Sequence, residues 1–108
     1  MLQLTIRDAL AALGDKGLSY AKLFAQPGLD IALYKPDQTD PQTPHLRDEI
    51  YVIATGSGTF MQEDESRPFG PGDLLFVPKG APHRFVDFTD DFSTWVIFFG
   101  KVPSGPSP

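Results

Sequence analysis

Turn-forming residues interrupt this chain so often that long helices have little room. Its 108 residues include eleven prolines and ten glycines, which separate short apolar stretches at intervals of about ten residues. Proline breaks a helix and glycine weakens it, whereas strands of about five or six residues fit between such turns. The spacing therefore predicts an all-β fold built from many short strands, as in a sandwich or a barrel.

The start of the chain is the exception, because it has a helical pattern. Thr5 and Asp8 have the spacing of a capping box, and Gly14 follows the apolar positions as a stop signal. The apolar residues at helical spacing are Ile6, Ala9, Leu10 and Leu13. One short N-terminal helix is expected before the strands.

Seven later stretches have the composition of strands. Pro27-Gly28 and Gly56-Ser57-Gly58 are turn signals between them, and we interpret the second as a hairpin. Eight of the nine phenylalanines lie from Phe60 to Phe99, which indicates an aromatic core in the later strands. The predicted strands are 18–25, 29–35, 49–54, 58–62, 73–77, 83–88 and 93–99.

Length and composition restrict the domain organisation. A chain of 108 residues has room for one domain, which we place at residues 1–101. Residues 36–44 contain three prolines and no large apolar side chain, so they are expected to form a loop. Residues 102–108 are rich in Pro, Ser and Gly and are predicted to be a disordered tail.

Charge and cysteine content exclude several classes of function. The net charge of -5 argues against a nucleic-acid partner, which needs a basic patch. No cysteine is present, so any metal must be held by histidine and carboxylate. The longest apolar run, 95–99, is far shorter than the ~20 residues of a membrane span, and no signal-peptide pattern opens the chain. We therefore expect a soluble, cytoplasmic protein without a membrane partner.

The two histidines of the chain each stand in a distinctive pattern. His45 precedes Glu49 by four residues, so in an extended segment both side chains point to the same side. His83 follows a Pro78-Lys79-Gly80 turn, where the proline presets the turn that begins the next strand. Considered alone, the spacing of His45 and Glu49 is more typical of a structural or exposed pair than of metal ligands.

Considered together, these patterns resemble the paired motifs of the cupin superfamily. The first motif is similar to His-x-His, three or four residues, Glu, six residues, Gly. The second is similar to Gly, five residues, Pro-x-Gly, two residues, His, three residues, Asn. Seven of the nine defined positions match at fixed offsets between residues 43 and 87, with Thr43 in place of the first histidine and Asp87 in place of the asparagine.

The resemblance implies a fold and a metal site. The fold would be a double-stranded β-helix, the jelly-roll cupin barrel, after the short N-terminal helix. The ligands would be His45, Glu49 and His83, a set that suits divalent Fe, Mn, Ni or Zn and leaves coordination positions open. The position that Thr43 leaves could be taken by water, by the neighbouring Gln42 or by a distant side chain.

Residues of the same parity as the expected ligands are candidates for binding a substrate. Thr43 shares the parity of His45, and Tyr51 shares that of Glu49, so both should face the barrel interior. Phe85 and Asp87 share the parity of His83 and are expected there too. Arg47 is either at the mouth of the barrel, pairing with an anionic substrate, or in a surface ion pair with Asp48.

Function stays open between classes at this point. The leading hypothesis is a metal-dependent enzyme, of oxygenase type with Fe(II), that acts on a small organic molecule. The alternatives are a metal-free domain that binds or senses a small molecule, and a purely structural module. Proteins that resemble this one are commonly homodimers, for which residues 18–25 are the candidate exchanged or added strand.

Overall fold

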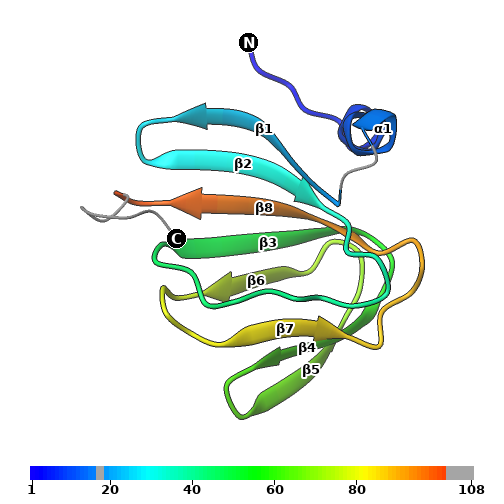
Figure 1. Ribbon diagram of the computed structural model, residues 1–108, viewed down its shortest axis with the longest axis vertical. Helices are drawn as coiled ribbons and strands as arrows, with labels where there is room; N and C mark the ends of the chain where they lie inside the picture. Colours follow the sequence, from blue (N-terminus) through cyan, green and yellow to red (C-terminus); the bar gives the residue numbers. More distant parts are fainter. Residues whose placement is uncertain (17–18, 102–108) are drawn as a thin grey trace.

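The structure, a computed structural model, describes residues 1–16 and 19–101 and contains one helix followed by eight strands (Figure 1). Apart from one additional strand, the elements match the predicted ones to within a few residues at each end. The elements are α1 (Ile6–Lys16), β1 (Tyr20–Gln26), β2 (Leu29–Tyr34), β3 (Asp48–Thr55), β4 (Gly58–Gln62), β5 (Glu65–Phe69), β6 (Leu74–Val77), β7 (His83–Val86) and β8 (Ser93–Phe99).

The strands form two antiparallel sheets that share one core. The larger sheet has the order β1-β2-β8-β3-β6 and the smaller one the order β5-β4-β7. Neighbouring strands are often distant in sequence: β8 lies between β2 and β3, so the chain winds between the sheets (Figure 1). This all-β double-sheet architecture is the predicted jelly roll.

The helix forms where the sequence predicts it and continues past Gly14 to Lys16. Its first turn is capped by Thr5, whose Oγ1 accepts a hydrogen bond from the backbone N–H of Asp8 over 3.1 Å. The apolar side packs against Leu33 and Trp95 on the outer face of the larger sheet. The helix therefore covers that face near β1 and β2 and does not contribute to the interior between the sheets.

Two sequence expectations were wrong in this part of the chain. Strand β5 was not predicted, because Glu65–Phe69 is polar and contains Pro68; it forms as an edge strand, where a missing N–H is tolerated. The Gly56-Ser57-Gly58 turn is not a hairpin, since β3 and β4 belong to different sheets. It carries the chain from one sheet to the other, and the carbonyl of Ser57 accepts a hydrogen bond from the N–H of Thr89 there.

Aromatic residues from both sheets fill the interior, as predicted. Tyr51 lies edge-on to Phe85, with ring centroids 4.8 Å apart, and Phe85 stacks at similar distances on Phe60 and Phe92. Such tilted pairs add to the free energy gained from burial. Phe76 is an exception: it lies on the outer face of β6 and is 51% exposed.

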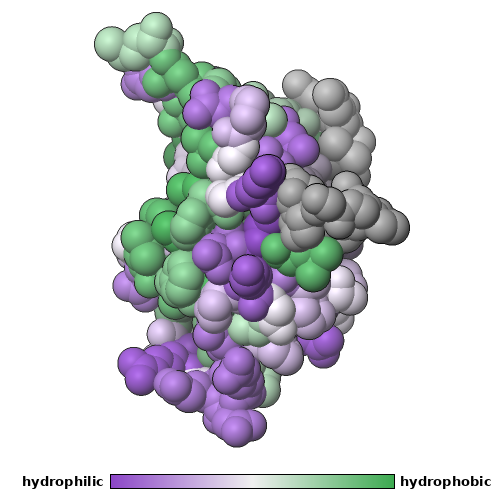
Figure 2. Space-filling model, turned by 90° about the vertical axis from the view of Figure 1, so that its left-hand side faces the viewer, coloured by the Kyte–Doolittle hydropathy of each residue, from purple (hydrophilic) through white to green (hydrophobic). Residues whose placement is uncertain are grey.

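The surface is apolar in places and strongly polar in others. In the side view of Figure 2, hydrophobic side chains form a band along one edge, and the β4–β5 hairpin at the bottom is hydrophilic.

The free edge of β1 pairs with no strand in the described part of the chain, so a homodimer through this edge stays a prediction. The 102–108 tail and Leu18 lie outside the described residues, and among the described ones no helix is long and apolar enough to cross a membrane.

Candidate metal centre

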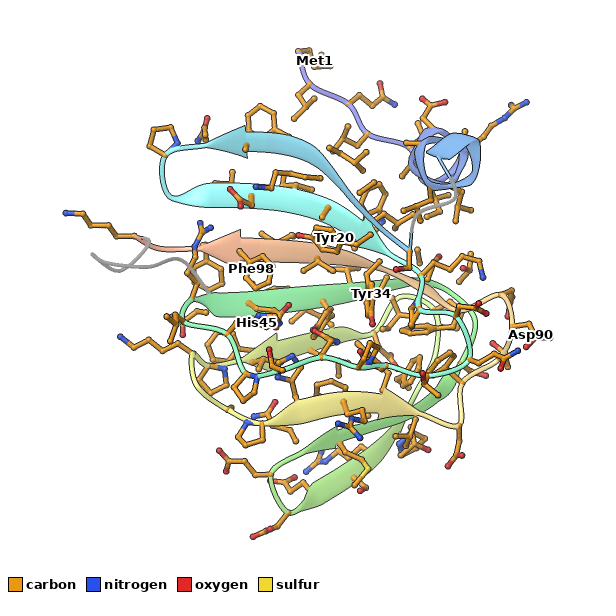
Figure 3. All side chains as sticks on the ribbon, viewed as in Figure 1. Met1, Tyr20, Tyr34, His45, Asp90 and Phe98 are labelled. Carbon is orange, nitrogen blue, oxygen red and sulfur yellow. The ribbon has the colours of Figure 1, made fainter. Side chains whose placement is uncertain are left out.

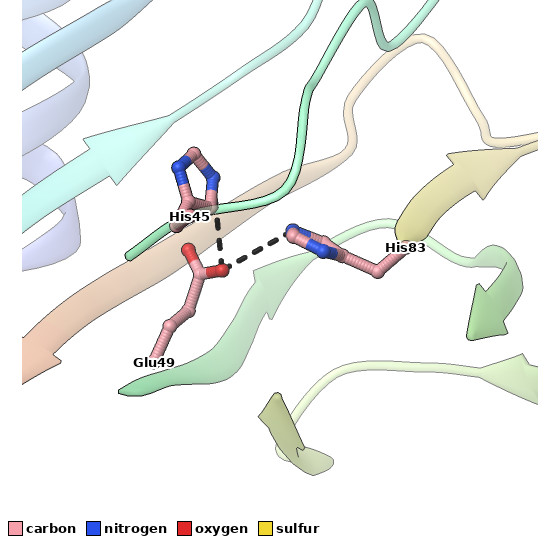
Figure 4. Close-up of side chains that lie close together, drawn as sticks. All are labelled: His45, Glu49 and His83. Carbon is pink, nitrogen blue, oxygen red and sulfur yellow. Dashed lines mark ion pairs between the residues drawn. The ribbon is translucent and has the colours of Figure 1, made fainter. Parts of the chain in front are cut away.

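His45, Glu49 and His83 come together between the two sheets (Figure 4). Glu49 is on β3 with its side chain toward the interior, and His83 is the first residue of β7 in the opposite sheet. His45 precedes β3. The potential ligand atoms of the three residues all lie within 4.8 Å of one another, a spacing that one metal ion could bridge.

The segment between β2 and β3, residues 35–47, carries His45 across the front of the sheets to this point (Figure 1). The backbone carbonyl of His45 accepts a hydrogen bond from the N–H of Gly80 over 2.7 Å. The carboxylate of Asp48 accepts another from the N–H of Lys79 over 2.9 Å. The first bond joins this segment, and the second joins the start of β3, to the turn before β7, so the two halves of the site are held together.

The tautomer of His83 is set by the backbone. Its Nδ1 lies 2.9 Å from the carbonyl oxygen of Ala81, which can only accept, so Nδ1 carries the hydrogen when the ring is neutral. The lone pair of Nε2 then faces Glu49 Oε1 at 3.2 Å. Histidines that bind metals usually donate their other ring N–H to such an acceptor, which fixes the tautomer and the orientation of the ring.

Glu49 is a buried carboxylate that lacks a hydrogen-bond donor. The residue is 1% exposed, and neither Oε1 nor Oε2 has a hydrogen-bond partner within the described structure. With the hydrogen of neutral His83 on Nδ1, the 3.2 Å contact between Nε2 and Glu49 Oε1 joins two acceptor atoms. A carboxylate buried in this way is costly unless a cation neutralises it, so the residues present fit a metal ion.

Gln42 supplies the fourth polar atom at the centre. Its Oε1 lies 3.2 Å from His45 Nε2 and 3.3 Å from His83 Nε2. The amide is oriented by Asp40, because Gln42 Nε2 donates to Asp40 Oδ2 over 2.9 Å. Asp40 is itself buried and accepts from the hydroxyl of Tyr34 and the N–H of Phe85.

Tyr51 places a hydroxyl donor close to these atoms. Its hydroxyl donates to Gln42 Oε1 over 2.8 Å and lies 3.1 Å from His83 Nε2. Burial, followed by the negative charge of Glu49, raises the pKa of Tyr51 well above its usual value. The hydroxyl therefore keeps its proton at neutral pH and remains a donor.

The two histidines differ in their tendency to take up a proton. Partial burial lowers the pKa of His45, against the opposing attraction of Glu49. Burial also lowers the pKa of His83, but its contacts with Glu49 and with the carbonyl of Ala81 raise it by more, so the net shift is upward. A proton on His83 Nε2 and a metal ion would therefore compete for the same position facing Glu49.

A cavity of about 550 Å³ opens beside this centre. Figure 3 shows Tyr20, Tyr34, His45 and Phe98 on the same side of the larger sheet, where they line this opening. The cavity therefore provides room for a small molecule next to the potential ligands.

The cavity contains some, but not all, of the predicted substrate-binding residues. Of the two alternatives for Arg47, the structure favours the position at the cavity, and its ion pair is with Asp30 and not Asp48, with 3.3 Å between Nη1 and Oδ2. Thr43 is exposed at its rim, while the neighbouring Gln42 takes the inward position.

Three further predicted positions can be compared with the structure. Tyr51 faces the centre through its hydroxyl, as expected from its parity. Phe85 is 1% exposed and packs in the aromatic core without lining the cavity. Asp87 is exposed and has a φ of 51°, because β7 ends at Val86 and the alternation of faces ends with it. Phe85 therefore faces the barrel interior as its parity predicts, whereas the same expectation for Asp87 was wrong.

Sequence reasoning missed the residues that lie outside the motifs. Asp40 is in an irregular segment, where no periodicity distinguishes an inward side chain. Lys22 and Asp30 line the far wall of the cavity from β1 and β2. Asp30 could have been found, because it alternates with Ala32 and Tyr34 on the inner face of an otherwise apolar strand.

Comparison with known proteins agrees with this architecture. The Cupin_2 family model, described as a cupin domain, matches residues 31–98 of the chain. The chain belongs to the cupin family. The matched region of this cupin contains all three candidate ligands.

Two curated proteins are similar to this cupin in sequence. One is Uncharacterized protein SCO3923 of Streptomyces coelicolor, 28% identical over 82 residues, which are 74% of this chain and 78% of that protein. The other is Dimethylsulfoniopropionate lyase DddQ of Ruegeria pomeroyi, 34% identical over 67 residues. That match covers 61% of this chain and only 33% of DddQ.

Solved structures share the fold of this cupin. KdgF from Halomonas sp. superposes with a TM-score of 0.67 at 24% identity, over 74% of this chain and 77% of that chain. At this level of identity the likeness concerns the fold, and the double-stranded β-helix predicted from the motifs is confirmed.

Proposed function

We propose that this cupin binds one divalent transition-metal ion at His45, Glu49 and His83, and that it uses this site in a reaction of a small organic molecule. The observation that carries the proposal is the fully buried carboxylate of Glu49, which has no donor in the described structure and faces the Nε2 atom of a histidine. A buried carboxylate that faces the lone pair of an imidazole is stabilised by a cation between the two groups.

Gln42 makes the site more complete than the three ligands alone. Its amide oxygen faces both histidines and takes the position that Thr43 leaves open in the motif. The Asp40 carboxylate holds the amide in this orientation. We propose that Gln42 either binds the metal directly or accepts a hydrogen bond from a water on it.

A bound metal would supply Lewis acidity, or with iron also redox chemistry with dioxygen. The residues of the chain have separate tasks around it. Tyr51 holds a proton beside the centre and, by donating it in a hydrogen bond to Gln42 Oε1, helps to hold that amide oxygen in place. The apolar residues Val96 and Phe98 exclude water from that side of the cavity.

The type of reaction is the finer part of the proposal. Two histidines and one carboxylate with open positions are typical of Fe(II) oxygenases, which supports an oxygenase reaction. The likeness to a lyase, DddQ, supports Lewis-acid elimination at the same site. Turnover that consumes dioxygen and requires iron would identify the oxygenase, whereas turnover with zinc in the absence of dioxygen would identify the Lewis-acid reaction.

Metal analysis of the purified protein tests the proposal. Protein prepared without added metal, or loaded with Fe(II) or Zn(II) and desalted, should retain about one ion per chain. His83→Ala should lose it and keep the β-sheet circular dichroism, whereas Arg84→Ala, on the exposed side of the same strand, should keep the ion. Wild-type protein that takes up neither metal would contradict the proposal and support the metal-free binding domain.

A further inference from the structure

A second group of charged side chains lines the cavity away from the metal centre. Asp30 on β2 contacts two cations through the same oxygen: Oδ2 lies 3.2 Å from Lys22 Nζ and 3.3 Å from Arg47 Nη1. All three residues belong to the cavity lining. In this Lys22–Asp30–Arg47 cluster, one carboxylate therefore faces two positive charges.

Arg47 is poorly satisfied for a buried guanidinium. Its side chain is 9% exposed, and its Nε has no hydrogen-bond partner in the described structure. Its other contacts are a long hydrogen bond from Nη2 to the carbonyl oxygen of Phe98, at 3.4 Å, and the ring of the same residue. Buried donors without acceptors are rare and call for an explanation, and the planar guanidinium is suited to a carboxylate.

The charge of the whole cavity also favours an anion. Its lining contains two positively charged residues, Lys22 and Arg47, and two negatively charged ones, Asp30 and Glu49. The lining is balanced without a metal and becomes positive once a divalent ion lies beside Glu49. Within the cluster itself the excess is a single positive charge, which matches one carboxylate better than a phosphate dianion.

Phe98 connects the two ends of the cavity. Its ring centroid is 5.0 Å from that of His45 and 5.9 Å from the guanidinium carbon of Arg47. A molecule lying along this ring would have one end at the metal centre and the other at the cluster. The ring provides an apolar surface for a short carbon chain between them.

We propose that the Lys22–Asp30–Arg47 cluster binds the carboxylate of a small organic acid whose opposite end lies at the metal centre. The orientation of the acid rests on the function proposed above, whereas the capture of the carboxylate does not. The cluster thus determines the substrate class, because neutral molecules of the same size would leave the excess positive charge uncompensated.

Binding of butyrate to the metal-free protein tests the cluster by itself. Chemical shift changes in a titration would give the Kd for wild type, Lys22→Met, Arg47→Met and, as a control that removes a charge from the outer face of β7, Arg84→Met. We expect butyrate to bind wild type and Arg84→Met equally, and both cluster variants about tenfold or more weakly. Lys22 is half exposed, so Lys22→Met keeps the test informative if Arg47→Met does not fold.

Two further probes separate the possible outcomes. Inorganic phosphate and 1-butanol should bind more weakly than butyrate; equal binding of either, or equal Kd values for all four proteins, would overturn the proposal. Zn(II) should tighten the binding of succinate, whose second carboxylate reaches the metal, more than that of butyrate. If the cluster variants lose butyrate but Zn(II) has no effect, the carboxylate site stands and the metal-based function fails.

Discussion

Gln42 donates a hydrogen bond from Nε2 to Asp40 Oδ2 over 2.9 Å, and this bond determines which atom of the amide faces the metal centre. The opposite orientation would turn the amide NH₂ toward the two imidazoles and leave the amide oxygen facing the Asp40 carboxylate. Asp40 itself accepts from the backbone N–H of Phe85 on β7. The orientation of Gln42 is thus set by the packing of the 35–47 segment on the smaller sheet.

Replacing Gln42 should weaken metal binding, whereas replacing its exposed neighbour should not. Gln42→Ala removes the oxygen that faces both histidines, and we expect a loss of about tenfold in Zn(II) affinity, as is typical for groups that support a metal site. Thr43→Ala is the matched control, because Thr43 lies at the cavity rim. Competition titrations with a chromophoric chelator measure both. If only Thr43→Ala loses Zn(II) affinity, Thr43 and not Gln42 supports the metal beside the three ligands.

Asp40 should be important for stability as well as for the site. Asp40→Ala leaves the buried N–H of Phe85 without an acceptor, so the free energy of unfolding should fall by about 1–3 kcal/mol. Tyr34→Phe is the control, since it removes only the hydroxyl bonded to Oδ1 and should cost about 0.5–1.5 kcal/mol. Urea unfolding of metal-free protein gives both values. Equal losses would mean that the backbone bond contributes little.

Glu49→Gln should make the metal-free protein more stable and abolish metal binding. The substitution keeps the shape of the side chain but removes a buried charge that has no donor. Above the pKa of His83, where the ring cannot neutralise Glu49, we expect a gain of about 1–3 kcal/mol in unfolding free energy. Thermal unfolding with and without Zn(II) checks this. Zn(II) should raise the melting temperature of wild type only, and a variant less stable than metal-free wild type would contradict the prediction.

The two histidines should give opposite pH dependences of stability. The raised pKa of His83 means that its contribution is fully present below the unfolded-state pKa of about 6.5 and is lost as pH rises through the folded pKa. The lowered pKa of His45 has the reverse sign: its contribution falls as pH drops below about 6.5.

Unfolding measurements on metal-free variants can separate these contributions. The stability difference between wild type and His83→Gln should shrink as pH rises from about 6 to about 9, and the difference for His45→Gln should grow as pH rises through about 6.5. If both stability differences change with pH in the same direction, the pKa values of the two histidines are not shifted in opposite directions, and the prediction fails. Metal occupancy should also fall as pH is lowered, because protons compete for the same nitrogen atoms.

The parts of the fold that could be predicted from the sequence are those with a local signal. The helix has a cap at Thr5, and the motif glycines and prolines indicate where strands end. Strand β5 could not be predicted, since its polar residues form a strand only because β4 offers an edge. The pairing of β8 between β2 and β3 is likewise a property of the whole chain, and no local pattern encodes it.

The candidate site divides along the same line. His45, Glu49 and His83 were found because a regular alternation or a motif spacing fixes each of them. The alternation of faces stops where a strand stops, so it was wrong for Asp87, one residue beyond β7. Lys22 and Asp30 meet Arg47 only because β1, β2, β8 and β3 lie in this order in the larger sheet, which a single sequence does not reveal.

Gly56 gives a test of the connection between the two sheets. A Cβ at this position would lie 2.5 Å from the Cα of Phe92 and 2.7 Å from its backbone nitrogen, and the φ of Gly56 is 80°. Gly56→Ala should therefore lower the free energy of unfolding by more than about 3 kcal/mol, from backbone strain and overpacking together. Gly72→Ala is the matched control, because its φ of 88° is similar but no atom lies within 4 Å of the added Cβ; strain alone should cost about 1–2 kcal/mol. The difference between the two variants in urea unfolding isolates the contact with Phe92. If the losses are equal, the backbone at Phe92 moves aside at no cost, and the crossover from β3 to β4 is less tightly packed than the structure indicates.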